Sequence, residues 1–511
     1  ASLADAEALG DYRRIDAEFA QLAATTGDEV RDAARRYLDP EAVAGVVYLP
    51  REKGSDLVSD DLARAVAVTR LDRGAGAAVT PGGYRPRPGA APRPSLTAAG
   101  VVEGVHHLAT PAFDLLIRRK PGVPLASVGV YVPRAAFDPD GKAGVSALAL
   151  RSAIRGAADL DAAALAFAFE RLGGTLSSSV THDWLGFGTS VLAANLSEAA
   201  ALLDLVLHEP RHDEPQVLAE RGLLIEETTQ VADDMFRYPF QLAFRAGFGG
   251  RGYGVPALGL PEDLGAITAA EVRSWHRAAL LGPRGVIVAV GDIEPVRALA
   301  ELAAVFGGHP ARARTELRTP VEWKFESGTV TQLAEREKAQ SAFAMAFPGP
   351  SRRDPRRHAA DVWSAVASGL GGRLFEALRD RRSLAYTVMA SPWQKARAGA
   401  FLAYIATSPE REEEALRELT RFAEEPVTAE ELLQATSYLA GQTEVNRQSA
   451  SEVASEILEA WLAGEGLGDL HDPAGRYREV GAEAVREIAA AVLGDTQVRA
   501  EGIVRGVGWG K

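Results

Sequence analysis

The segment GLGGRLFEALRDRRSLAYTV, residues 369–388, is the most informative stretch of this 511-residue chain. Three glycines interrupt an apolar segment with helical spacing: Gly369, Gly371 and Gly372. The pattern predicts a short helix that ends in an arginine cluster at 379–382, and a β-type run that opens at Tyr386. A helix-to-strand turn would then hold Arg379 and Tyr386, which are seven residues apart.

The spacing of these two residues does not by itself assign them a chemical role. Arginines are common in the last turn of a helix, because a cation there interacts favourably with the helix dipole. A tyrosine at the start of a strand is commonly a half-buried sheet residue. A functional assignment therefore needs support from the rest of the chain.

Composition limits the class of protein. The chain is 47% hydrophobic and 24% charged, as in ordinary globular proteins, and its length predicts two to four domains. A formal net charge of -13 argues against nucleic acid or an anionic membrane as the main partner. No uninterrupted apolar run reaches about 18 residues, so no membrane span is predicted.

The chain contains no cysteine, which excludes disulfides and cysteine metal ligands. A cysteine-free chain of this length suits an oxidising compartment, so we favour a periplasmic or secreted location and keep a cytoplasmic one open. The first residues, ASLADAEALGDYRR, lack the basic and apolar regions of a signal peptide.

Three segments share one layout, which indicates an internal repeat. They are TGDEVRDAARRYLDPEAVAGVVYLP (26–50), TAAEVRSWHRAALLGPRGVIVAVGD (268–292) and AEAVREIAAAVLGDTQVRAEGIVRG (482–506). Each has a Val-Arg pair and a leucine eight residues after that valine. A threonine followed by acidic residues opens the first two helices, and a strand is expected after each helix, although the third strand has a poorer pattern.

The second and third segments each close a unit of similar length, which predicts domains at 101–316 and 317–511. Too few residues precede the first segment to form such a unit. We therefore interpret residues 1–72 as the C-terminal tail of a preceding unit; the alternative is a small helical extension that matches by chance. Residues 73–100, rich in Pro, Gly and Ala, are predicted to be an extended linker.

Both long units mix strands and helices in the same order. The first predicts a strand at 125–133, helices at 141–156 and 161–173, paired strands within 175–192 and a helix at 197–210. The second predicts a strand at 341–349 and a helix at 358–370. The predicted fold class is α+β, with two homologous units that each pack helices on a mixed or antiparallel sheet.

Segment 369–388 closely resembles the C-terminal-domain signature of the pitrilysin/insulinase family of zinc peptidases, the inverzincins. The resemblance covers nearly the whole chain and is strong at 363–391 and at the three unit ends. It implies that Arg379 and Tyr386 grip a peptide substrate and stabilise the transition state, with Gly371 and Gly372 in the same substrate-binding segment. It also implies that the two units form a bowl-shaped half of a clamshell.

The family's metal motif is H-x-x-E-H on the first long helix of its catalytic unit, with a further glutamate downstream. Here the aligned positions hold Gly144, Ala147 and Leu148, and no side chain there can bind a metal. Glu226 and Glu227 lie near the place of the downstream ligand. The chain itself is predicted to supply no metal ligand, and zinc is expected on a partner subunit or N-terminal fragment that carries H-x-x-E-H.

Two other hypotheses remain open. His208-Glu-Pro-Arg-His212 spells the ordinary zincin motif H-E-x-x-H, but Pro210 would break the continuous helix that the motif needs, at about 3 kcal/mol for a proline in a helix interior. Alternatively, the chain is a non-catalytic scaffold or assembly subunit of the same fold. Retention of both Arg379 and Tyr386 favours the peptidase half.

Overall fold

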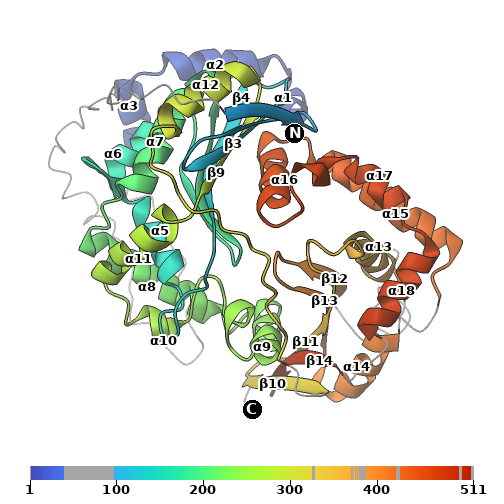
Figure 1. The fold of residues 1–511 in the computed structure, drawn as a ribbon. Coiled ribbons are helices and arrows are strands. Elements are labelled where there is room, and N and C mark those ends of the chain that lie inside the picture. Colours follow the sequence, from blue (N-terminus) through green and yellow to red (C-terminus); the bar gives the residue numbers. More distant parts are fainter. Residues whose placement is uncertain are drawn as a thin grey trace. The chain divides into compact units, whose positions relative to one another are not determined.

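The computed structural model describes residues 2–38, 97–324, 328–369, 372–374, 376, 378, 387–421, 426–493 and 498–507. The chain divides into two compact units, Ala1–Gly82 and Gly83–Lys511, which are described separately. Figure 1 shows the elements of both units, coloured along the sequence.

Residues 2–38 of the smaller unit form three helices: α1 (Ser2–Ala8), α2 (Arg14–Ala24) and α3 (Gly27–Tyr37). The predicted start of α3 is confirmed, because Thr26 and Glu29 form a reciprocal capping box. The Glu29 amide donates to Thr26 Oγ1 (3.3 Å) and the Thr26 amide donates to Glu29 Oε2 (2.7 Å). No residue of α2 or α3 is buried.

The first sheet of the larger unit has seven strands in the order β1-β2-β3-β9-β4-β8-β7. They are β1 (Thr97–Val102), β2 (Val105–Ala109), β3 (Phe113–Arg119), β4 (Leu125–Pro133), β7 (Ser177–Val180), β8 (Trp184–Leu192) and β9 (Gly285–Gly291). β3 and β9 are parallel, and the other neighbours are antiparallel. The strand predicted at 125–133 and the hairpin predicted within 175–192 are confirmed.

One boundary differs from the expectation. The predicted linker runs to residue 100, yet β1 begins at Thr97 and pairs with β2, with Gly100 opposite His107. Residues 97–100 are therefore part of the sheet, because their backbone groups find partners in a neighbouring strand that the local composition does not reveal.

Helices cover one face of this sheet. They and their neighbours are α5 (Val145–Ala153), α6 (Ala162–Glu170), α7 (Leu196–His208), α8 (Glu214–Val231), α9 (Arg237–Gly247), α10 (Pro261–Leu264), α11 (Ala269–Leu281) and α12 (Pro295–Phe306). A short hairpin, β5 (Gly156–Ala157) and β6 (Leu160–Asp161), precedes α6. α7 and α12 pack together against the sheet in the largest apolar core. α11 begins with a second capping box, between Thr268 and Glu271, as the repeat predicts.

The second sheet has five strands in the order β10-β14-β11-β13-β12. They are β10 (Thr329–Arg336), β11 (Ser341–Pro348), β12 (Thr387–Gln394), β13 (Gly399–Thr407) and β14 (Arg499–Gly506). Its helices are α13 (Arg357–Ser368), α14 (Glu412–Arg421), α15 (Ala429–Asn446), α16 (Ala450–Leu462), α17 (Pro473–Arg478) and α18 (Ala482–Leu493).

The two sheets repeat one topology. The order β10-β14-β11-β13-β12 reproduces β3-β9-β4-β8-β7, and the parallel pair occupies the same place in each sheet. In the first sheet, β9 follows α11 and lies between β3 and β4. In the second sheet, β14 follows α18 and lies between β10 and β11. The predicted α+β fold with two homologous halves is thus confirmed, and the third repeat strand forms in full despite its poorer pattern.

Each half lends one helix to the sheet of the other half. α9 packs on β14, β11 and β10, while α16 packs on β9 and β4 (Figure 1). Small residues permit the first contact: a Cβ on Gly502 of β14 would lie 1.8 Å from the Pro239 carbonyl oxygen and 2.6 Å from the Ala243 nitrogen of α9. The α9 contact therefore requires glycine at position 502.

We predict that Gly502→Ala lowers the free energy of unfolding by about 3 kcal/mol, the upper end of the usual cost of overpacking, because the opposing atoms are backbone atoms. Chemical denaturation of the full chain measures the change. The matched control is Gly441→Ala in α15, where a Cβ meets nothing within 4 Å and the higher helix propensity of alanine should leave stability unchanged or raised. Equal stability of wild type and Gly502→Ala would contradict the prediction.

Candidate functional site

The sequence-predicted site falls largely outside the described residues. Arg379, Tyr386 and Gly371 are not among them, so their roles stay predictions. Gly372 is described and lies in a tight turn: its amide donates to the Gly369 carbonyl (2.7 Å), and its own carbonyl accepts from Glu376 (3.1 Å). A Cβ on Gly372 would lie 2.7 Å from the Ala367 carbonyl oxygen, so the turn requires glycine there.

The elements on either side of this segment are held together by side chains. Ser368, the last residue of α13, exchanges two hydrogen bonds with the backbone of Ala390 in β12, donating to its carbonyl at 2.8 Å. Ser364, one turn earlier, donates to the same carbonyl at 2.9 Å. The end of α13 is therefore fixed against the edge strand that follows Tyr386.

Arg373 anchors the first described residues after the glycine turn. Its Nε and Nη2 donate to the two carboxylate oxygens of Glu431 at 2.6 and 2.7 Å, and Nη2 also donates to the Pro426 carbonyl. The hydrogen bonds from Arg373, with those from Thr428, lower the pKa of Glu431 to about 2. Glu431 also forms the capping box of α15 with Thr428. Arg373 thus holds this segment against α15; it stands within the glycine signature but was not predicted as a site residue.

The positions aligned with H-x-x-E-H are packed into an apolar core. Gly144 is the N-cap of α5 with φ +103°, and a Cβ there would lie 2.6 Å from Leu264 Cδ2 and 2.9 Å from the Leu258 carbonyl oxygen. Ala147 and Leu148 are fully buried in an apolar cluster that includes Val217. Glu227 is ion-paired with Arg151 at 2.6 Å. These residues do not fit a zinc ion.

The break predicted at Pro210 is confirmed. α7 ends at His208, Pro210 forms a β-bridge with Ala157, and His212 has φ +45°. His212 is buried, with Nδ1 2.9 Å from Ser152 Oγ, and burial with the charge of nearby His276 lowers the pKa of His212 to about 3. His208 and His212 therefore do not project from one helix face, as a zincin site requires.

His208 belongs instead to a cluster with Asp204 and His309, the group of described residues that comes near metal-ligand spacing. Asp204 Oδ1 lies 2.9 Å from His208 Nδ1 and 2.8 Å from His309 Nε2. The two imidazole rings stack, with centroids 3.9 Å apart and planes at 9°. Arg312 Nη2 lies 2.6 Å from His208 Nε2. Sequence spacing shows only the Asp204–His208 pair, because His309 follows about one hundred residues later.

This arrangement fits hydrogen bonding better than metal binding. The lone pair of an imidazole nitrogen lies in the ring plane, and because the two stacked rings are nearly parallel with centroids 3.9 Å apart, their lone pairs do not point at one ion. The donor Arg312 also requires His208 Nε2 to accept, which leaves Nδ1–H to donate to Asp204. Burial acts to raise the pKa of Asp204, but the hydrogen bonds from His208 and His309 outweigh burial, so the pKa is lowered.

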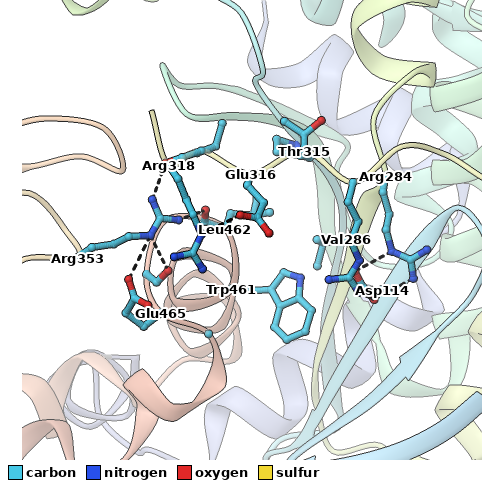
Figure 2. Close-up of a pocket in the computed structure, with 15 residues that line it drawn as sticks. Asp114, Arg284, Val286, Thr315, Glu316, Arg318, Arg353, Trp461, Leu462 and Glu465 are labelled. Atoms are coloured by element: carbon cyan, nitrogen blue, oxygen red, sulfur yellow. Dashed lines mark hydrogen bonds and ion pairs between the residues drawn. The ribbon is translucent and has the colours of Figure 1, made fainter. Parts of the chain in front are cut away.

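A cavity of about 290 Å³ lies where the first sheet, the connection at 314–318 and the end of α16 meet (Figure 2). Trp461 and Val286 contribute apolar walls, and Glu316 and Arg318 also line the cavity (Figure 2). Arg318 and Arg314 are 62% and 69% exposed. An indole wall beside exposed cations can bind a side chain or an extended peptide.

Two partly buried arginines of this cavity serve the fold. Arg284 donates to both carboxylate oxygens of Asp114 at 2.9 Å, and Arg353 donates to the carbonyls of Leu317, Ala396, Leu462 and Gly464. Burial acts to raise the pKa of Asp114, but hydrogen bonds from His107 and Arg284 outweigh burial and lower the pKa to about 2. Only the exposed arginines remain well placed to meet a ligand.

Residues 266–439 match the family model described as the peptidase M16 inactive domain. An uncharacterised zinc protease of Streptomyces coelicolor is 26% identical over 64% of this chain and 73% of its own length. An uncharacterised zinc protease of Mycobacterium tuberculosis is 27% identical over 58% of this chain and 68% of its own length.

Solved structures share the fold at low identity. A peptidase M16 inactive domain from Pseudomonas fluorescens has a TM-score of 0.70 and 20% identity, covering 80% of this chain and 99% of that one. The periplasmic protease PqqL from Escherichia coli has a TM-score of 0.68 and 13% identity, covering 88% of this chain and 51% of that one. No described helix combines the length and apolar character needed to cross a bilayer. The resemblance to the pitrilysin/insulinase (M16) peptidases is confirmed, and it is to their inactive domain.

We predict that His208→Ala leaves the zinc content of the purified chain unchanged after exposure to zinc and dialysis, because Asp204, His208 and His309 satisfy one another by hydrogen bonds. Elemental analysis by mass spectrometry measures the content. Stoichiometric zinc in the wild type that disappears in His208→Ala would show that the cluster is a metal site after all.

We also predict that Asp114→Asn lowers stability at neutral pH by about 2 kcal/mol, because the folded state lowers the pKa of Asp114 from 3.8 to about 2. A lowered pKa stabilises the fold above the unfolded-state value, and that stability is lost as pH falls from about 4 through about 2. The difference between wild type and variant in urea unfolding should therefore narrow in that range. Asp292→Asn, at a half-exposed ion pair with Arg119, should cost less than about 1 kcal/mol at any pH.

Proposed function

We propose that this chain is the non-metal half of a bipartite zinc metalloendopeptidase that cleaves peptides or unfolded segments. The observation that carries the proposal is the closed apolar packing at Gly144, Ala147 and Leu148, where the family places its zinc ligands. A partner subunit or N-terminal part with H-x-x-E-H would hold the zinc. The match to the inactive M16 domain and the zinc-protease relatives support this assignment.

Arg379 and Tyr386 would contribute to catalysis by hydrogen bonding. Arg379 would donate to a peptide carbonyl or the developing oxyanion, and the Tyr386 hydroxyl would donate beside it. Such donors work best when their position is fixed in advance. The contacts of Ser368 with Ala390 and of Arg373 with Glu431 support this role, because they fix the flanks of the segment that carries the pair.

Residues 1–72 would form the tail of another unit of the same kind. In α11 and α18 the repeat valines Val272 and Val485 are fully buried, and Leu280 is too. Val30 and Leu38, their equivalents at α3, are 59% and 74% exposed. The apolar positions of α3 are thus exposed where those of its two counterparts are buried. A third α+β unit would provide a surface on which they could pack.

The alternative is a scaffold subunit of the same fold. A chain of complex III2 from Candida albicans has a TM-score of 0.64 over 80% of this chain, at 14% identity. A probable β subunit of the mitochondrial-processing peptidase of Arabidopsis thaliana is 21% identical over 45% of this chain. A scaffold has no need of Arg379 and Tyr386, so we favour the peptidase half. For its location we keep periplasmic or secreted first, as with the periplasmic neighbour PqqL.

We predict that Arg379→Ala, in the complex with the zinc-bearing partner, lowers kcat/KM for an unstructured peptide by about 100- to 1000-fold without changing zinc content. Tyr386→Phe should have an effect of the same kind, because it removes only the donor. The control is Arg356→Gln, an exposed arginine paired with Asp354. Unchanged activity in Arg379→Ala would support the scaffold, and zinc-dependent hydrolysis by the chain alone would refute the bipartite proposal.

A further inference from the structure

The indole of Trp461 gives the cavity of Figure 2 a wall that is both apolar and able to donate a hydrogen bond. The ring is half-buried and lies 4.8 Å from the ring of His107, measured between centroids. Its Nε1–H donates to no acceptor in the described part of the chain. A buried tryptophan usually pairs this group, so the wall can accept an apolar side chain together with a hydrogen-bond acceptor.

Arg314 is the arginine of this cavity whose charge is least compensated. Its side chain is 69% exposed, and Nη2 lies 3.9 Å from Asp114 Oδ1, beyond hydrogen-bond distance. Asp114 already accepts from Arg284 at both oxygens, at 2.9 Å each, and from His107 at 3.1 Å. Among the described residues, no carboxylate therefore lies within hydrogen-bond distance of Arg314.

The other charges that line the cavity are paired. Arg318 lies 2.8 Å from Glu316, and Arg353 lies 3.4 Å from Glu465. The two glutamates are thus compensated and should repel an incoming acid only weakly. The pair of Arg318 with Glu316 is well exposed, and such pairs contribute little to stability, so Arg318 can also turn to a ligand at small cost.

The backbone that carries Arg314 is fixed on both sides. The Arg284 amide donates to the Ala313 carbonyl at 2.7 Å. Arg353 Nη1 donates to the carbonyl of Leu317, a residue that is only 2% exposed. A ligand would therefore have to immobilise the side chain of Arg314 but not the segment itself, which lowers the entropic cost of binding.

The indole and Arg314 lie at the same end of the cavity. The ring of His107 contacts Trp461, and its Nε2 lies 3.1 Å from Asp114 Oδ1, the oxygen nearest to Arg314. Figure 2 shows Trp461 and Asp114 beside the same space. The volume of about 290 Å³ is at the lower end of ordinary ligand sites, so the cavity suits one or two side chains of an extended peptide.

We propose that this cavity binds a carboxylate of an extended peptide, with the adjoining apolar side chain packed against the indole of Trp461. Arg314 pairs with the carboxylate through two parallel N–H groups, the geometry that a guanidinium provides and an ammonium does not. The Trp461 Nε1–H donates to the peptide beside it. Such a site gives the proposed peptidase half a substrate class, acidic peptides with an apolar neighbour, and it rests on that proposed function.

The first test is fluorescence anisotropy of labelled peptides with the full chain. The probe carries glutamate next to phenylalanine among uncharged residues and has an amidated C-terminus. We expect its Kd to be about tenfold lower than that of the same peptide with glutamine, because a charge-assisted pair is lost. A third peptide, with glutamine and a free carboxylate after the phenylalanine, shows whether a chain terminus can supply the carboxylate. Equal binding of all three would overturn the proposal.

Variants of the exposed arginine assign the preference to this cavity. Arg314→Gln should remove it while the chain stays folded, since the side chain is largely exposed. The matched control is Arg251→Gln, an exposed arginine 3.4 Å from Asp140, which should keep the preference. Trp461→Leu should narrow the preference for phenylalanine over serine beside the glutamate. A carboxylate preference that survives in Arg314→Gln would contradict the assignment.

The second test is kinetic and uses the complex with the zinc-bearing partner. The glutamate peptide should have the lower KM at a similar kcat, and Arg314→Gln should raise that KM to the value for the glutamine peptide. Cleavage of both peptides with equal KM would refute the carboxylate site and leave the proposed function intact. Cleavage of neither peptide would contradict the proposed function, while the anisotropy measurement still decides whether the site exists.

Discussion

The exchange of α9 and α16 between the two halves is the constraint on which the larger unit depends. Each sheet would otherwise expose an apolar face: Val286, Val288 and Val290 on the first sheet pack on α16, and an alanine-rich face of the second sheet packs on α9. Each half therefore completes the apolar core of the other half with one helix. A polar contact accompanies the exchange, because Asp183 in the β7–β8 turn accepts from Tyr253 of the first half and from the Ala396 amide in the β12–β13 turn. Neither half is expected to keep its sheet covered alone.

The exchange of α9 and α16 also shapes the cavity of Figure 2 and supports β12, the two regions that could contact a ligand. The cavity in Figure 2 has Trp461 as a wall only because α16 of the second half lies on the first sheet. Arg353 then joins three parts by its hydrogen bonds: the connection at Leu317, the β12–β13 turn at Ala396, and the end of α16. Since β12 begins just after Tyr386, the exchange also fixes the strand that the predicted substrate segment leads into.

Local patterns allowed the repeat and many elements to be predicted. Thr26 and Thr268 predicted helix starts because capping is a short-range hydrogen bond, and Pro210 predicted the end of α7 because proline lacks the donor that a helix needs. The helix exchange could not be predicted, since its signal is the meeting of Gly502 with Pro239, far apart in sequence. The pairing of His309 with Asp204 is equally non-local. Arg379 and Tyr386 came from a family signature and stay predictions.

The residues at the start of α5 avoid the cost of burying a metal-binding motif that has no metal. A histidine-and-glutamate motif buried without its metal would leave ionisable groups unpaired, which is expensive in an apolar core. Glycine, alanine and leucine at 144, 147 and 148 avoid that cost and let Leu264 and Leu258 pack directly against the helix start. The polar contacts near the glycine signature instead stabilise the flanks of the Arg379–Tyr386 segment, through Ser368 and Arg373. This packing agrees with the proposal that the metal is supplied by another part of the assembly.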